Sequence, residues 1–324
     1  MASRRGSVGL WVWLLTAGVA STIWAQGDFQ KGFSYYKQGQ HEKAILELEA
    51  VIQANPDYED GYRILGDCYL KTQQYSQAST AFQQAIRLKN DFFASYYGLA
   101  LAYYNSGRYR DSIDTLLKGE QYARSPRERH GVYRTRGLAY LNESEFSLAL
   151  SDLEKANTLR RGDLANILSL GLAHFHLGNP TEAEKYLQQV SARQPEHAVA
   201  REYLGQIRYK RAVEFLKGKD YRQASLFLQE YLKNHPQDGE AWFNMGLAYL
   251  FLDDSSAAKE AFIKSDTFRP GSGETYDRLG YIAEMTGDYR AALQYYQKAL
   301  AVDPKPGIRK SVKRVQERIH RKKG

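Results

Sequence analysis

The sequence predicts an all-α protein, an α-α superhelix in which helix-turn-helix repeats stack as a right-handed solenoid that ends in a C-terminal capping helix. Three observations lead to this prediction: a 34-residue period, a fixed pattern of small and large residues within each period, and an amphipathic basic segment at the C-terminal end. Eight repeats are expected, at residues 25–58, 59–92, 93–126, 130–163, 164–197, 205–238, 239–272 and 273–306.

Each repeat contains two sets of apolar positions at helical spacing. Positions 4, 7, 8 and 11 fall on one face of a first helix, and positions 20, 24 and 27 fall on one face of a second. Position 8 is Gly or Ala in all eight repeats, position 20 is Ala in all but one, and position 24 is Leu, Phe or Tyr. Small residues let the two helices approach closely while large residues fill the space beside them. The pattern therefore predicts antiparallel helix pairs that bury their faces by stacking.

Glycine and proline mark the expected turns. We place the turn inside a repeat near Gly39, Gly107, Gly178 and Gly287, because glycine readily ends a helix. Proline cannot continue a helix and is expected to separate consecutive repeats; it stands at position 32 of five of them, as Pro56, Pro195, Pro236, Pro270 and Pro304.

Two short segments interrupt the period. Residues 127–129 and 198–204 are additional to the repeats that follow them. Seven added residues are nearly two helical turns, so the apolar face stays in phase. We therefore predict one long helix over about 198–217 that continues through Gly205.

The first 25 residues resemble a targeting segment that precedes a repeat domain at 26–306. Arg4 and Arg5 come before an uncharged apolar run, and Ala25 supplies a small residue before a cleavage point. These features predict a signal peptide at 1–25 and an exported, periplasmic protein. The alternative is an uncleaved signal anchor, because the run approaches the roughly 17–20 residues that span a bilayer. The protein would then be anchored in the inner membrane facing the periplasm; a secreted protein is a further alternative.

Residues 307–324 are expected to form a basic capping helix and tail. Ile308, Val312, Val315 and Ile319 recur at spacings of four, three and four, which predicts a helix with one apolar stripe. Of the 45 basic residues in the chain, nine lie in 305–324 with a single acidic residue. Outside this segment and the two N-terminal arginines, 34 basic residues face 36 acidic ones. The tail either caps the last repeat or also contacts an acidic partner, anionic lipid or nucleic acid.

The repeat resembles the tetratricopeptide repeat (TPR) family over about 25–306. In that family the first helices line a concave groove into which positions 2, 5, 6, 9, 12 and 13 point, so the resemblance implies a groove that binds peptide segments. Here these positions are rich in aromatic residues with interspersed polar ones, as at peptide-binding hot spots. The alternative is that several of them pack against the next first helix. The candidate peptide-binding residues are Phe29, Phe33, Tyr36, Arg63, Tyr97, Tyr104, Arg134, Tyr209, Phe243, Asn244, Arg278 and Tyr281.

No sequence motif indicates catalysis or a cofactor. The chain contains no Walker loop, no glycine-rich dinucleotide turn and no nucleophile elbow. His174 and His176 lie two residues apart, on different faces of a helix, so we predict no metal site. Cys68 is the only cysteine and fits a packed helical position better than a nucleophile.

These features predict a non-catalytic scaffold or adaptor whose partners are peptide segments of other proteins, acting in cell-envelope assembly or organisation. The alternative is a membrane-tethered assembly factor whose basic tail contacts anionic lipid or an acidic partner. Nucleic acid is not an expected ligand, because the main body of the chain is nearly neutral.

Overall fold

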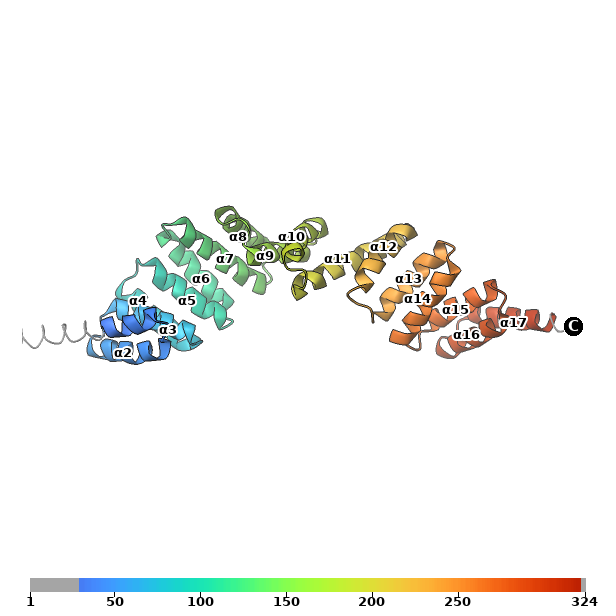
Figure 1. The fold of residues 1–324 in the computed structure, drawn as a ribbon, viewed down its shortest axis with the longest axis horizontal. Helices are drawn as coiled ribbons and strands as arrows, with labels where there is room; N and C mark the ends of the chain where they lie inside the picture. Colours follow the sequence, from blue (N-terminus) through green and yellow to red (C-terminus); the bar gives the residue numbers. More distant parts are fainter. Residues whose placement is uncertain (1–28, 322–324) are drawn as a thin grey trace, which may run out of the picture. The chain divides into compact units, whose positions relative to one another are not determined.

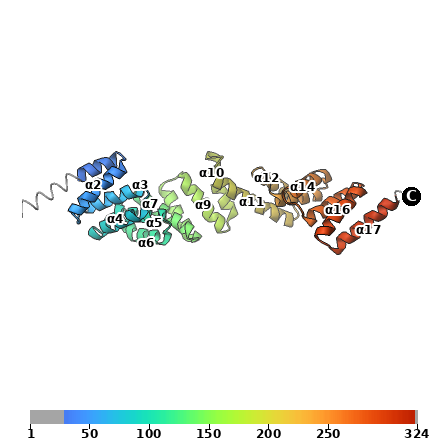
Figure 2. The same cartoon turned by 90° about the horizontal axis from the view of Figure 1, so that it is seen from below.

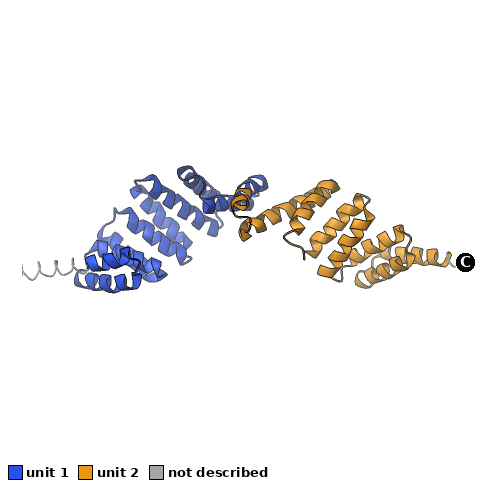
Figure 3. Cartoon of the chain, viewed as in Figure 1, with its two compact units in different colours: residues 1–186 blue, residues 187–324 orange. Residues whose placement is uncertain are grey.

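The structure is a computed structural model that describes residues 29–321, and helices joined by turns make up this part of the chain. It divides into two compact units, residues 1–186 and 187–324 (Figure 3), and the boundary falls inside a helix. Each unit is described by itself below. The predicted all-α class is confirmed for the described residues.

Unit 1 consists of consecutive helices that pack as antiparallel neighbours (Figures 1 and 2). Residues 29–37 form its first described helix. The helices that follow are α2 (His41–Ala54), α3 (Glu59–Lys71), α4 (Tyr75–Leu88), α5 (Phe93–Asn105), α6 (Tyr109–Gly119), the short 3₁₀ helix η1 (Glu120–Tyr122), α7 (Pro126–Asn142), α8 (Phe146–Leu159), α9 (Leu164–His176) and α10 (Pro180–Arg193), which contains the boundary.

Unit 2 repeats the same arrangement. Its helices are α11 (Ala198–Lys217), α12 (Tyr221–Leu232), α13 (Gly239–Phe251), α14 (Ser255–Phe268), α15 (Gly273–Met285), α16 (Tyr289–Val302) and α17 (Pro306–Arg321). The predicted long helix is confirmed, because α11 continues through Gly205 without a break. The predicted capping helix is also confirmed: α17 packs against α16, and Ile308 and Val315 are buried between them.

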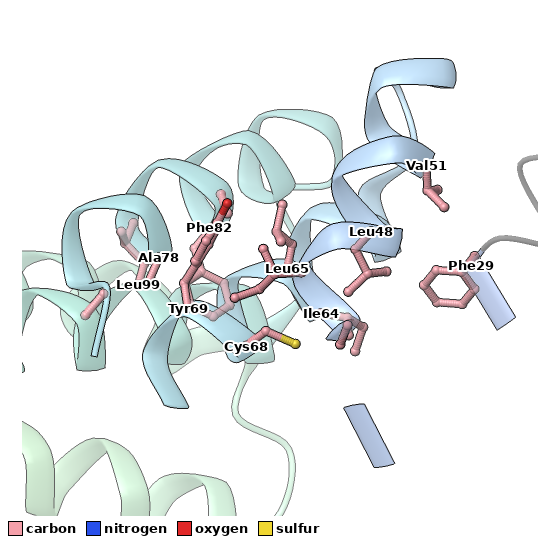
Figure 4. Close-up of a cluster of buried hydrophobic side chains, with 14 of the residues drawn as sticks. Phe29, Leu48, Val51, Ile64, Leu65, Cys68, Tyr69, Ala78, Phe82 and Leu99 are labelled. Carbon is pink, nitrogen blue, oxygen red and sulfur yellow. The ribbon is translucent and has the colours of Figure 1, made fainter. Parts of the chain in front are cut away.

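The close approach of paired helices depends on the small residue at position 8. A Cβ atom added to Gly66 would lie 2.9 Å from the ring of Phe82, and one added to Gly137 would lie 2.8 Å from Leu153. The large partner is fully buried in each case. Figure 4 shows the resulting core in unit 1, where Leu48, Phe82 and Leu99 from three successive repeats belong to one cluster.

The turn inside each repeat has the same backbone geometry, whatever residue occupies it. Glycine with φ of 74° to 80° stands at position 15 of four repeats, at the predicted sites Gly39, Gly107, Gly178 and Gly287. The other four repeats hold non-glycine residues at the same position with φ of 61° or 62°: Gln73, Ser144, Lys219 and Asp253. These residues bear the steric cost of the left-handed conformation, about 1–2 kcal/mol each.

The added residues 127–129 lengthen the start of α7. Ser125 and Glu128 form a reciprocal capping box there, which satisfies free N–H groups of the first turn. About two turns further along α7, the buried guanidinium of Arg136 binds Asp152 of α8 at 2.5 Å and Glu120 of η1 at 2.6 Å. This ion-paired cluster attaches the 3₁₀ helix to the fourth repeat.

Candidate protein-binding surface

The first helices of successive repeats lie beside one another within each unit: α3, α5, α7 and α9 in unit 1, and α11 and α13 in unit 2. In each unit, the exposed side of the first helices, including the helix at 29–37 in unit 1 and α15 in unit 2, is what we call the first-helix surface, and the predicted peptide-binding residues lie on these helices. These side chains differ in how deeply they are buried and in how many hydrogen bonds and ring contacts they already make within the protein.

The N-terminal aromatic row is largely part of the core. Phe29 is buried, stacks on Phe33 at 5.7 Å between ring centroids, and meets Tyr58 edge-on at 5.0 Å. Phe33 in turn stacks on Tyr36 at 6.1 Å. Phe29 is therefore placed by packing, as in the alternative interpretation, while Phe33 and Tyr36 keep partly exposed rings.

Polar groups beside this row are paired within the protein. The Tyr36 hydroxyl lies 3.5 Å from a carboxylate oxygen of Asp67, and burial raises the pKa of both groups. Arg63 donates to Asp60 at 2.5 Å and lies 5.2 Å from the ring of Phe92. A peptide that binds Arg63, as predicted, would therefore have to compete with Asp60 and Phe92 for its guanidinium group.

Three further predicted residues, Tyr97, Tyr104 and Arg134, lie on the neighbouring helices α5 and α7. The hydroxyl groups of Tyr97 and Thr135 lie 3.3 Å apart across the two helices. Burial raises the pKa of Tyr104, and the positive charge of Arg134 acts in the opposite direction. Arg134 Nε lies 3.8 Å from the Asp163 carboxylate without forming a hydrogen bond to a described residue. Tyr97, Tyr104 and Arg134 each retain partial exposure.

In unit 2, Tyr209 and Asn244 are joined directly. The Asn244 side-chain amide donates to the Tyr209 hydroxyl at 3.0 Å, and the Tyr209 ring lies 5.0 Å from that of Tyr231. Burial, with the nearby Glu240 carboxylate, raises the pKa of Tyr209 to about 12. These two residues connect α11 to α13. The Asn244 amide and the Tyr209 hydroxyl, which were predicted to contact a peptide, are therefore already hydrogen-bonded to each other.

A cavity of about 670 Å³ opens between α13, α15 and the start of α17. Phe243 and Leu247 supply an apolar wall, while Glu274, Asp277 and Arg278 supply charges. Among the described residues, these three charged side chains form no hydrogen bond or ion pair. Lys305 also lines the cavity and is paired with Asp303 at 2.7 Å. A cavity with an apolar wall and a few free polar groups is typical of a binding site.

Large apolar side chains are exposed on the same two helices. Tyr281 and Met285 lie one turn apart on α15 with 43% and 56% of their surfaces exposed. Phe251 at the end of α13 is 57% exposed, and one side of its ring stacks on Tyr221 of α12 at 4.5 Å. We call these three residues the apolar patch. The sequence identified Tyr281 as a candidate, and Phe251 also belongs to the groove positions. Met285 was missed, although it occupies position 13 of its repeat, as Phe251 does.

The two histidines of α9 pack against aromatic rings. His174 stacks on Tyr186 at 5.5 Å and His176 stacks on Phe146 at 4.6 Å. Within residues 29–321, no three His, Cys, Asp or Glu side chains converge as a metal site would require, and no helix is both long and apolar enough to cross a membrane. The segment 1–25 lies outside the described residues.

Stacked two-helix repeats, each packed mainly on its neighbours in sequence, define an α-solenoid protein. Comparison with known families gives the particular repeat. Family models described as "Tetratricopeptide repeat" match residues 27–58, 168–211, 239–271 and 273–306, and a family model described as "TPR repeat" matches residues 66–107. The chain therefore belongs to the tetratricopeptide repeat proteins, which generally act as protein-interaction scaffolds.

Curated relatives are distant and longer than this chain. Superkiller complex protein 3 of Mus musculus is 23% identical over 82% of this chain but 17% of its own length. The DnaJ homolog subfamily C member 7 homolog of Dictyostelium discoideum is 24% identical over 74% of this chain and 48% of its own length. The Hsp70-Hsp90 organizing protein of Triticum aestivum is 22% identical over 77% and 43%. The chain thus spans less than half the length of each of these three relatives.

Solved structures with similar folds include two other TPR proteins. The C-terminal part of a TPR repeat-containing protein from Cytophaga hutchinsonii has a TM-score of 0.48 and 17% identity, covering 76% of this chain and 98% of that one. YrrB, a TPR protein with an unusual peptide-binding site, has a TM-score of 0.41 and 15% identity, covering 74% and 97%.

Proposed function

We propose that this protein is a non-catalytic adaptor that binds extended or helical peptide segments of other proteins on the first-helix surface of unit 2. The observation that supports this site is the apolar patch of Phe251, Tyr281 and Met285 on the two helices that also line the 670 Å³ cavity. Large apolar side chains left in water are unfavourable for an isolated fold and are typical of interaction sites. Glu274, Asp277 and Arg278 would then orient the peptide through its backbone and charged groups.

We further propose that the adaptor works in cell-envelope assembly or organisation, in the periplasm. The support comes from the sequence of residues 1–25, where two arginines precede an apolar run that ends in a small residue. N-terminal sequencing of the protein from its host tests this: a mature chain that begins near Gln26 indicates cleavage and export. An intact N-terminus favours the membrane-tethered assembly factor instead.

Photo-crosslinking in the native host, started from position 281, tests the binding site. We expect the triple variant Phe251→Ala, Tyr281→Ala, Met285→Ala to lose a specific crosslinked protein, because truncation at a hot spot costs about 2 kcal/mol or more per residue. For this comparison the photoreactive residue is moved to the neighbouring exposed Thr286, which is not one of the proposed binding residues.

The matched control is Leu226→Ala, Ile263→Ala, Val302→Ala, which removes exposed apolar side chains from the second helices of the same unit. The control should keep the crosslink. If both triple variants keep it, or both lose it while their circular dichroism is unchanged, the apolar patch is not the binding site.

A further inference from the structure

Helix α17 has two chemically different faces. Ile308 and Val315 are buried, and Val312 and Ile319 are half-buried, in the cluster that α17 forms with α16. The opposite face is exposed and carries Arg309, Lys310, Lys313 and Arg321 together with one acidic residue, Glu317. None of these five side chains forms a hydrogen bond or ion pair with a residue in the range 29–321.

Two other cations of α17 have structural partners. Arg314 donates to both carboxylate oxygens of Glu284 at 2.7 Å, and Arg318 donates to the Tyr289 hydroxyl at 3.2 Å. These contacts fix the helix to α15 and α16. The four unpaired cations are therefore not needed to hold α17 in place, and they define what we call the basic face: Arg309, Lys310, Lys313 and Arg321.

Capping alone does not explain the basic face. A terminal helix must present a polar outer surface to water, and mixed charges of both signs meet that need. Here the free charges are four positive and one negative, and Lys322 and Lys323 follow in the sequence. The rest of the chain has nearly balanced charges, so the excess is local. A local surface of one sign fits a partner of the opposite sign.

The form of the basic face narrows the class of partner. It has no exposed aromatic or large apolar residue, which disfavours base stacking, a protein hot spot and insertion into a hydrocarbon layer. No side chain of the basic face lines the cavity at the start of α17, which excludes a small anion held there. What remains is a row of long, flexible cations along a helix of about 24 Å.

We propose that the basic face of α17 adsorbs electrostatically to a bilayer surface that carries anionic lipid headgroups. Clusters of four to eight Lys and Arg residues on an amphipathic helix bind such surfaces through diffuse charge without a shaped pocket. The outer face of a terminal capping helix is open to a flat surface. This inference does not depend on the peptide-binding site, since it uses other residues and another ligand.

Vesicle co-sedimentation of the full chain tests the proposal. The vesicles contain phosphatidylcholine alone or with 30% phosphatidylglycerol, and binding to the neutral vesicles measures any contribution from the apolar run at 8–25. We expect tighter binding to the anionic vesicles, lost at high salt because exposed charges are screened. The variant Arg309→Gln, Lys310→Gln, Lys313→Gln, Arg321→Gln should bind them roughly 1,000-fold more weakly, given the usual contribution of each cation near such a surface.

The matched control is Lys210→Gln, Arg222→Gln, Lys259→Gln, Arg290→Gln, which removes four exposed cations from α11, α12, α14 and α16 of the same unit. The control should retain binding to within about threefold, because those charges lie on separate helices. Equal loss in both variants, or equal binding of the wild type to neutral and anionic vesicles, overturns the proposal.

A final comparison separates lipid from nucleic acid. A 30-base-pair DNA duplex is titrated into the same proteins at 150 mM salt. Binding of the duplex that is tighter than binding of the anionic vesicles, and that is lost only in the α17 variant, overturns the proposal and assigns the basic face to nucleic acid. Thermal melting of both variants should match the wild type, since Arg314 and Arg318 are unchanged.

Discussion

At the scale of single residues, the small residue at position 8 of a repeat packs against the large residue at position 24. A Cβ atom on Gly246 would lie 2.7 Å from the Phe262 ring, and one on Gly280 would lie 2.8 Å from Tyr296. Where position 8 is alanine instead, position 24 is leucine, as in the pair Ala212 and Leu228. Alanine at position 8 thus occurs opposite leucine and never opposite an aromatic ring in these repeats.

This matching predicts the outcome of a double-mutant cycle. Gly246→Ala should destabilise the protein by about 1–2 kcal/mol, because overpacking a rigid core exceeds the gain of about 1 kcal/mol in helix propensity. Phe262→Leu alone leaves a void and should cost about 1–2 kcal/mol. The double variant recreates the pair Ala212 and Leu228 and should be less destabilised than the sum, which urea unfolding measures. Strictly additive effects would contradict the matching.

The residue scale also shows where sequence reasoning succeeds and where it fails. Gly39 and the three equivalent glycines mark their turns directly, because glycine prefers the left-handed backbone. Lys219 and Asp253 adopt the same conformation, although nothing in their side chains favours it strongly, and only the 34-residue period points to them. Met285 was missed although it occupies position 13, the same groove position as Phe251, so the period could have identified it as well.

At the scale of elements, the apolar stripe of α17 predicted the capping helix, but its polar attachment could not be predicted. Glu284 and Arg314 are 30 residues apart and meet only because α15, α16 and α17 pack together. Which charged residues pair across helices depends on side-chain directions that spacing alone does not give. The same holds for Arg136, which joins η1 and α8.

The attachment predicts that α17 loosens in acid. Hydrogen bonds from Arg314 lower the pKa of Glu284 below its ordinary value. A carboxyl group with a lowered folded-state pKa stabilises the fold above its unfolded pKa of about 4.5, and this contribution is lost as pH falls through the folded pKa. We expect amide protection of α17, corrected for intrinsic exchange rates, to drop below about pH 4.5 relative to α16.

Glu284→Gln should reduce this protection already at pH 7 and remove most of its acid dependence. The matched control is Glu317→Gln on the exposed face of α17, which has no partner among residues 29–321 and should behave like the wild type. An acid dependence that persists unchanged in Glu284→Gln would show that the Arg314 contact does not govern the docking of α17.

At the scale of the whole molecule, the period predicted the stacking of helix pairs but not the division into two compact units. Each helix packs mainly on its neighbours in sequence, which periodic apolar positions encode directly. The boundary between Tyr186 and Leu187 lies inside α10, within a repeat whose sequence pattern is regular. A local sequence pattern does not show how contacts between residues are distributed over several repeats. The division into two units is therefore seen only in the three-dimensional structure.

The two units should respond independently to damage in their cores. Phe82 in unit 1 and Phe262 in unit 2 both occupy position 24, both are fully buried, and their core clusters draw on one unit each. Phe262→Ala should cost about 3–5 kcal/mol and abolish exchange protection in α13–α16 at urea concentrations where α3–α8 remain protected. Phe82→Ala should give the reverse pattern, so each variant serves as the control for the other. Hydrogen exchange with mass spectrometry in graded urea measures the protection of both units.

Equal loss of protection in the two units for either variant would contradict this prediction. It would mean that the chain unfolds as one cooperative body, because the coupling between repeats is stronger than the energy of any single core.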